Sequence, residues 1–205
     1  AIGLVGSEMC IRDRPKILKT EVADDKTIKW LLELNDENKN LIEVVLIPSK
    51  SHNTICVSVQ VGCAMSKNSA CIHCATGTQL LVKNLSASEI VMQMMIAKRH
   101  LNDFGDQRLL SRVVLMGSGE PLTNYKETKQ FIKILMEPEG IHMGKKSITL
   151  STIGVPDKII QFTDELGVHL ALSIHAGTNE KRNKVIPINK KYPLEEVIKS
   201  CKYYT

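Results

Sequence analysis

Strand-like and helix-like segments alternate along most of this chain, and this alternation restricts its fold more than any other feature. Short apolar runs at 54–61, 112–116, 147–152 and 168–175 are each followed by a segment with helical signals. Parallel strands need crossover connections, usually helices, so the pattern is typical of a parallel sheet. The sequence therefore predicts an α/β fold with a curved parallel sheet.

Capping and proline signals mark where the helices begin. Ser86 and Glu89 have the spacing of a capping box and open a helix that runs to about Leu101. Residues 124–136 carry an apolar helical face, and Pro156 and Pro193 suit the first positions of two further helices.

A β-hairpin is predicted before this alternating region. Two apolar, β-branched stretches, Ile28–Leu34 and Leu41–Ile47, flank the polar run NDENKN, which is rich in turn-forming residues. We assign residues 15–50 to a β-hairpin extension and residues 51–205 to the parallel-sheet domain.

The first fourteen residues, AIGLVGSEMCIRDR, share no helical or strand period with the residues after them. They resemble the translated read-through of a sequencing adapter, so we exclude residues 1–14 from the fold. On this interpretation the chain is a fragment of a longer protein.

Composition narrows the class of protein. Hydrophobic residues make up 43% of the 205 residues, enough for a buried core. No apolar run approaches the roughly 20 residues that cross a bilayer, and no secretory leader is visible, so we expect a cytoplasmic protein with no membrane partner. The formal net charge of +5 is compatible with a polyanionic partner but does not require one.

Four of the six cysteines cluster within nineteen residues, at positions 56, 63, 71 and 74. Without a leader, such a cluster indicates metal or redox chemistry rather than disulfides. Cys63, Cys71 and Cys74 follow a predicted strand and could give three thiolates to an iron–sulfur cluster, leaving one iron open for a small molecule. Two alternatives remain: buried thiols that only pack, or a zinc site completed by His73 or Cys56.

Other polar residues also fall at the carboxyl ends of predicted strands, where α/β sheets collect their chemistry. Gly119 permits close backbone approach to a ligand, and Glu120 could accept a hydrogen bond from an amine. Ser151 and Ser173 could donate to a carboxylate or a ribose. His175 by default is a packed histidine.

Several longer strings carry a family resemblance: CVSVQVGCAM, CATGT, KNLSASEIV, VVLMGSGEPLTNY, LSTIGVP and LALSIHAGTNEKRNKVIPINKKYPLEEV. From about Leu41 to Tyr204 the chain resembles the radical S-adenosylmethionine (SAM) RNA methyltransferases of the RlmN type. The resemblance implies a partial TIM-type (β/α) radical SAM barrel, truncated at its C-terminal end, with the β-hairpin as an N-terminal extension.

The resemblance also implies roles for individual residues. The three cysteines at 63, 71 and 74 match the ligands of a 4Fe-4S cluster whose open iron chelates SAM. Glu43 matches the family's proton acceptor, and Cys56 matches the thiol that resolves a covalent protein–RNA intermediate. The positions that match SAM contacts are Gly119, Glu120, Ser151, Ser173, Ile174 and His175.

The implied reaction is methylation of carbon 2 of an adenine in 23S rRNA and tRNA, through a methyl-cysteine near the C-terminus of the complete protein. A SAM-derived radical activates that methyl group, Glu43 removes a proton from the adenine, and Cys56 releases the product by forming a disulfide with the carrier cysteine. A low thiol pKa would suit Cys56. The implied partners are the RNA and an electron donor such as flavodoxin or ferredoxin, and we expect a monomer.

Three departures from the family pattern stand out. Seven residues, AMSKNSA, separate Cys63 from Cys71 where the family has three, and Leu80 replaces a usual glycine. The chain also stops at Thr205, before the expected carrier cysteine, and Cys201 is assigned only a packing role. Two competing functions are a Cfr-type enzyme acting on carbon 8, which Pro121 disfavours, and a metal-binding RNA module without catalysis.

RNA contacts are only weakly marked. A basic run could meet phosphates, although a solvated basic face gives the same pattern. Aromatic residues make up 4% of the chain, so no base-stacking platform is evident. The basic residues are Lys181, Arg182, Lys184, Lys190 and Lys191.

Overall fold

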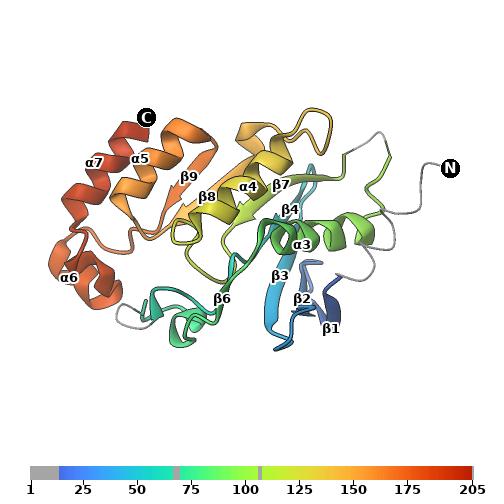
Figure 1. Cartoon of the computed structure of the whole chain (residues 1–205), viewed down its shortest axis with the longest axis horizontal. Helices are drawn as coiled ribbons and strands as arrows, with labels where there is room; N and C mark the ends of the chain where they lie inside the picture. The colour runs from blue at the N-terminus through green and yellow to red at the C-terminus, as the bar shows by residue number, and fades with distance from the viewer. Residues whose placement is uncertain (1–13, 67–69, 106–107, 205) are drawn as a thin grey trace.

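A single seven-stranded sheet organises the computed structural model, which describes residues 14–66, 70–105 and 108–204. Its strand order is β1-β2-β3-β4-β7-β8-β9, and helices line one side of it (Figure 1). The adapter-like segment lies outside the described residues, apart from Arg14. The strands of this sheet are β1 Lys16–Val22, β2 Ile28–Glu33, β3 Leu41–Pro48, β4 Asn53–Cys56, β7 Leu110–Leu115, β8 Ile148–Thr152 and β9 His169–Leu172.

The predicted hairpin is confirmed as β2 and β3, which pair antiparallel with Ile28 opposite Leu46. Two features were not foreseen. β1 adds a third antiparallel strand, and β3 pairs directly with β4, so the hairpin and the parallel strands share one sheet. The alternating side chains of β2 explain its place, because Trp30 and Leu32 are buried between half-buried neighbours.

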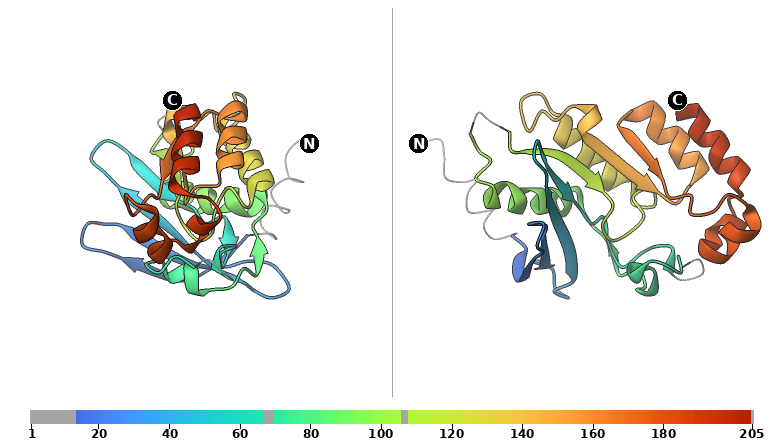
Figure 2. Two further views of the ribbon diagram at one scale, coloured as in Figure 1. Left: turned by 90° about the vertical axis from the view of Figure 1, so that its left-hand side faces the viewer. Right: turned by 180° about the vertical axis from the view of Figure 1, so that it is seen from behind.

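The parallel region is confirmed as well. β4 pairs parallel with β7, β7 with β8, and β8 with β9, each pair being joined through a helix. From behind, the strands lie in front of the helices (Figure 2, right). α6 was not foreseen, and α7 packs against α5. The helices are α3 Ala87–His100, α4 Tyr125–Met136, α5 Pro156–Glu165, α6 Asn179–Val185 and α7 Leu194–Tyr204.

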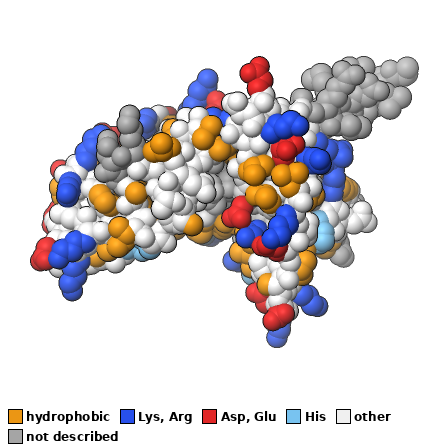
Figure 3. Space-filling view, turned by 90° about the horizontal axis from the view of Figure 1, so that it is seen from below, with side chains coloured by type: hydrophobic (Ala, Val, Ile, Leu, Met, Phe, Trp, Pro, Cys, Tyr) orange, Lys and Arg blue, Asp and Glu red, His pale blue; other side chains and the backbone are white. Residues whose placement is uncertain are grey.

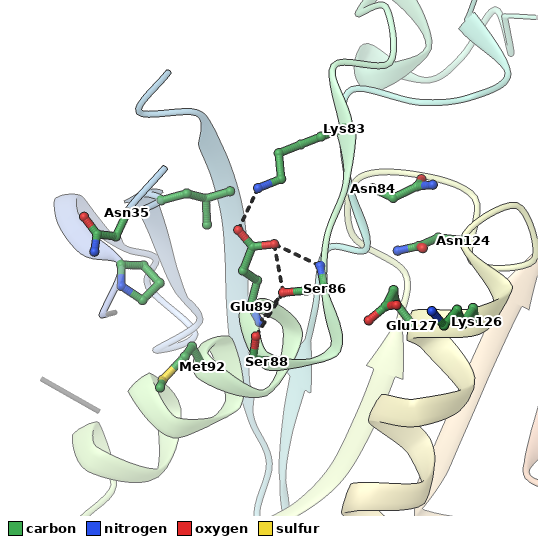
Figure 4. A pocket seen from close by; sticks show the side chains of 12 residues that line it. Asn35, Lys83, Asn84, Ser86, Ser88, Glu89, Met92, Asn124, Lys126 and Glu127 are labelled. Atoms are coloured by element: carbon green, nitrogen blue, oxygen red, sulfur yellow. Dashed lines mark hydrogen bonds and ion pairs between the residues drawn. The ribbon is translucent and has the colours of Figure 1, made fainter. Parts of the chain in front are cut away.

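The helix starts follow the local signals. Ser86 caps α3, and Glu89 completes a reciprocal capping box (Figure 4). Pro156 occupies the first turn of α5, where its missing N–H is not needed, and α7 begins directly after Pro193. Among the described helices, none has the length and apolar character needed to cross a membrane.

Strand pairing gives the sheet two distinct faces. Ile55, Val113 and Ile148 are paired neighbours and are fully buried on the face that the helices cover. Because side chains alternate along a strand, the next residue of each strand points to the opposite face. Cys56 and Val114 therefore lie on that open face, where both are only half-buried.

The predicted strand 54–61 is wrong in its second half. β4 ends at Cys56, and β5 (Gln60–Val61) pairs instead with β6 (Lys83–Asn84) in a separate two-stranded sheet. The physical reason is a side chain. Gln93 of α3 accepts from the Ser58 N–H at 2.8 Å and donates to the Ser58 carbonyl at 2.9 Å, so it replaces a strand partner.

The predicted strand 168–175 is likewise too long, since β9 ends at Leu172. Beyond it the backbone turns tightly: Ala176 donates to the Ile174 carbonyl at 2.7 Å, and His175 adopts a positive φ of 54°. His175 therefore leaves the sheet, and residues 173–175 form a loop at its carboxyl edge.

The role of Gln93 can be tested by Gln93→Ala. The substitution leaves the buried N–H and carbonyl of Ser58 without hydrogen-bond partners. We therefore expect the free energy of unfolding to fall by about 3 kcal/mol in chemical denaturation. Gln130→Ala, on the exposed side of α4, is the matched control and should change it by less than about 0.5 kcal/mol. Equal effects of the two substitutions would contradict this account.

Candidate active site

A cavity of about 540 Å³ opens at the carboxyl ends of β7, β8 and β9. It lies between the cysteine loop (residues 63–74) and the glycine-rich loop after β7 (residues 117–121). This confirms the prediction that the polar and thiol residues gather at one edge of the sheet. The predicted site residues that line it are Cys63, Cys71, Cys74, Gly119, Glu120, Ser151, Ser173 and His175.

The three cysteines that line this cavity are partly buried. Burial raises the pKa of the Cys63 thiol, and burial together with Cys74 and Cys63 raises the pKa of Cys71 to about 11. The Cys74 N–H donates to the Cys71 carbonyl at 3.1 Å, which closes a tight turn between them. Residues 67–69 of the long loop lie outside the described residues.

The donor set suits a cubane cluster. Among the described residues, no group of three or more His, Cys, Asp or Glu side chains is arranged to hold one metal ion. In a cubane each thiolate binds a different iron, so the sulfurs need not converge on one point. Three thiols on one cavity wall fit such a group, and the described cysteines are all free.

Gly62 explains how the cysteine loop tolerates Leu80. A Cβ at Gly62 would lie 2.0 Å from the Leu80 carbonyl oxygen, and Gly62 has a positive φ of 74°. The close approach involves only backbone atoms of Leu80 and Gln79, and Leu80 as a residue is 65% exposed. A side chain at position 80 is accommodated because it points to solvent, while position 62 requires glycine.

Gln60 connects the cysteine loop to the glycine-rich loop, and sequence reasoning missed it. Its Oε1 accepts from the Ala64 N–H at 3.1 Å and from the Glu120 N–H at 3.0 Å. Its Nε2 donates to Asn84 and Thr123. A signal was present, since a fully buried glutamine inside an apolar run needs partners.

Glu120 is buried and joins the loops after β7 and β8. Its carboxylate accepts from the Leu122 N–H at 3.1 Å, the Thr152 hydroxyl at 2.7 Å and the Ile153 N–H at 3.0 Å. Burial raises its pKa, and these hydrogen bonds act in the opposite direction. A carboxylate has about four acceptor positions, so one remains for a ligand amine.

The ends of β8 and β9 bring two hydroxyls together, with the Ser151 and Ser173 oxygens 3.4 Å apart. His175 lies beside His73, their ring centroids being 4.0 Å apart. His175 is exposed and lines the cavity, so it is not the packed histidine taken as the default. The Ile174 side chain is 42% exposed and is not among the described residues that line the cavity.

Glu43 and Cys56 lie on the open face of the sheet, not in the cavity wall. Val45 pairs with Cys56, and Glu43 precedes Val45 by two residues on the same face. The Ser58 hydroxyl donates to the Glu43 carbonyl at 2.7 Å, and Lys29 forms an ion pair with the Glu43 carboxylate at 3.2 Å. Burial raises the pKa of the Cys56 thiol, contrary to the low value that would suit it.

The five basic residues between positions 181 and 191 differ in their exposure to solvent. Arg182 is fully buried, so its prediction as a phosphate contact is wrong. The four lysines are exposed, and Figure 3 shows basic side chains at the end of the molecule that carries α6 (left). Cys201 packs against the core from α7, as expected.

A second, larger cavity of about 800 Å³ lies away from the cysteines, near the starts of α3 and α4 (Figure 4). Lys83 projects at its edge and forms ion pairs with Asp36 and Glu89. The Glu127 carboxylate accepts from the Ala87 N–H at 2.9 Å. These charged groups therefore pair with one another and with the start of α3.

Comparison with known proteins identifies the class that this fold and site define. Residues 57–205 match the family model described as the radical SAM superfamily. The chain belongs to that superfamily, whose cofactors are a 4Fe-4S cluster and SAM. The crystal structure of a radical SAM methyltransferase from Sphaerobacter thermophilus superposes with a TM-score of 0.87 at 35% identity, covering 99% of this chain and 59% of that one.

Among curated proteins, the chain is similar to two named dual-specificity RNA methyltransferase RlmN. The protein from Bradyrhizobium diazoefficiens is 42% identical over 200 residues, covering 94% of this chain and 49% of the relative. That from Rhodopseudomonas palustris (strain BisA53) is 42% identical over 207 residues, covering 94% and 50%. The chain thus spans about half the length of the curated relatives it matches.

Gly62→Ala tests the packing of the cysteine loop. A Cβ against the Leu80 carbonyl, at a positive φ, should lower the free energy of unfolding by about 3 kcal/mol and reduce the iron bound after anaerobic reconstitution. Gly144→Ala is the control, because a Cβ there meets no atom within 4 Å. Unchanged stability and iron content in Gly62→Ala would show that the loop does not need glycine.

Proposed function

We propose that the protein to which this chain belongs methylates carbon 2 of an adenine in 23S rRNA and tRNA through a methyl-cysteine intermediate. The observation that carries this proposal is one cavity shared by three thiols, a buried glutamate and two strand-end hydroxyls. Such a cavity suits an iron–sulfur cluster with a bound amino acid. The proposal is also supported by the similarity of the chain to proteins named dual-specificity RNA methyltransferase RlmN.

In this proposal one set of residues binds the cluster and a second set binds SAM. Cys63, Cys71 and Cys74 hold the 4Fe-4S cluster as thiolates, which leaves one iron open to the amine and carboxylate of SAM. When bound, the cluster and SAM supply a 5′-deoxyadenosyl radical and a methyl group. Gly119, Glu120, Ser151, Ser173, Ile174 and His175 bind SAM.

The local geometry supports most of the proposed SAM-binding roles. Glu120 keeps an acceptor position for the ligand amine, and Ser151 and Ser173 can donate to a carboxylate or a ribose hydroxyl. Gly119 lines the cavity at a positive φ of 101°, and a Cβ there would lie 2.5 Å from the Gln60 side chain, so the loop needs glycine at this position. His175 lines the cavity beside His73. The role of Ile174 rests on the family resemblance alone, because its backbone N–H and carbonyl bind Leu172, Ala176 and Arg182.

Glu43 and Cys56 act on the substrate from the open face. Glu43 accepts the proton from carbon 2 of the adenine after the new carbon–carbon bond has formed, and Lys29 holds its carboxylate. The Cys56 thiolate then attacks the sulfur of the carrier cysteine, supplied by the rest of the protein. Before this attack, the radical formed by addition to the adenine would return one electron to the oxidised cluster. The S–C bond then breaks with its electron pair going to the product carbon, which takes up a proton to become the methyl group, and the two cysteines form a disulfide.

The partners follow from the same chemistry. The RNA strand approaches past the exposed lysines of α6 and η3 (Pro187–Lys190), whose charges attract phosphates. The adenine must leave its stack to reach carbon 2. A flavodoxin or ferredoxin supplies electrons, and the protein works in the cytoplasm as a monomer.

The cluster assignment is tested by single substitutions. Cys63→Ala, Cys71→Ala and Cys74→Ala should each abolish the visible absorbance of the anaerobically reconstituted 4Fe-4S cluster, because each removes one iron ligand. Cys201→Ala should leave it intact. Stoichiometric zinc without a chromophore in the unaltered chain would overturn the proposed radical chemistry.

The role of Cys56 is tested in the full-length protein. Cys56→Ala should keep the cluster and SAM cleavage but block product release, so RNA should stay crosslinked to the protein on a denaturing gel. Cys56→Ala combined with Glu43→Gln should give the same band, because both block steps after bond formation. Loss of the iron absorbance in Cys56→Ala would mean that this thiol is a cluster ligand instead.

A further inference from the structure

Arg182 is a fully buried cation whose hydrogen bonds all go to uncharged groups. Its Nε donates to the Ile174 carbonyl at 3.1 Å, and an Nη donates to Asn189 at 2.7 Å. The other Nη donates to the Ile153 carbonyl. The Arg182 side chain, which comes from α6, therefore links the loop that follows β8 to the loop that follows β9.

This arrangement leaves a positive charge uncompensated. Among the described residues, no carboxylate forms an ion pair with Arg182, and a guanidinium stays charged in proteins. Burying an unpaired charge costs several kcal/mol, whereas a neutral donor could bind the same carbonyls at lower cost. The Glu120 carboxylate accepts from the N–H of the same residue, Ile153, whose carbonyl binds Arg182.

The cysteine loop lies against the same helix. The Ile72 N–H donates to the Val185 carbonyl of α6 at 3.1 Å, next to Cys71. Arg182 also binds the carbonyl of Ile153, a residue that lines the same cavity as Cys71. A negative group held by the three cysteines would therefore lie within the field of the buried guanidinium.

We propose that Arg182 is a positioning residue whose buried charge balances the cysteine-ligated cluster and raises its reduction potential. This inference rests on the proposed function, specifically on Cys63, Cys71 and Cys74 as ligands. Three thiolates outweigh the positive charge of the oxidised cubane, and the added electron makes the reduced cluster more negative still. A nearby cation stabilises the reduced form more than the oxidised form, so the potential rises.

Two substitutions of Arg182 separate charge from packing. Arg182→Gln removes the charge, whereas Arg182→Lys keeps it, and both lose the bonds that join Ile153 to Ile174. In the reconstituted chain, redox titration followed by electron paramagnetic resonance should give a more negative midpoint for Arg182→Gln and one near the wild-type value for Arg182→Lys. Thermal unfolding of the cluster-free chain should be lowered in both.

Asn189→Asp tests the charge while Arg182 stays in place. Its carboxylate would stand at the acceptor position 2.7 Å from the guanidinium and neutralise it, so the midpoint should again become more negative. This variant decides the matter if Arg182→Gln does not fold. Midpoints equal to wild type in the folded neutralising variants would overturn the inference alone. A wild-type chain that takes up no cluster would overturn the proposed function, and this inference with it.

Discussion

Residues in the loops at the carboxyl edge of the sheet lie beyond the strand ladder, so buried side chains must form hydrogen bonds with their backbone N–H and C=O groups. Buried N–H and C=O groups without partners are costly, so each loop residue that leaves the ladder needs a replacement. Some replacements are local, and others come from at least 29 residues away and connect neighbouring loops. They are Gln93 on Ser58, Gln60 on Ala64 and Glu120, Glu120 on Leu122 and Ile153, and Arg182 on Ile153 and Ile174.

This polar network gives the cavity its shape and its charge. Glu120 and Arg182 act on opposite sides of Ile153, so a buried acid and a buried base position the same loop. The cysteine loop adds three thiols, two of which have a pKa raised by burial. In the proposed assignment, binding of the cluster releases these protons, and the charge of Arg182 favours the resulting thiolates.

The open face of the sheet carries the second half of the proposed chemistry. Strand alternation puts Cys56, Ser151 and Ser173 on one face, although they come from different strands or strand ends. Glu43 joins them from the antiparallel strand β3, which pairs with β4. A substrate on this face would meet Glu43 and Cys56 on one side and the cavity on the other.

Local sequence determined the helix starts, the hairpin, the strand order along the chain and the clustering of site residues. These features depend on near neighbours, such as the capping box of Ser86 and Glu89. Only the tertiary structure decided where β4 ends, because Gln93 binds Ser58 from 35 residues away. It also decided that Arg182 is buried while Lys181 beside it is exposed, since burial depends on the loops that pack around a charge and not on the charge itself.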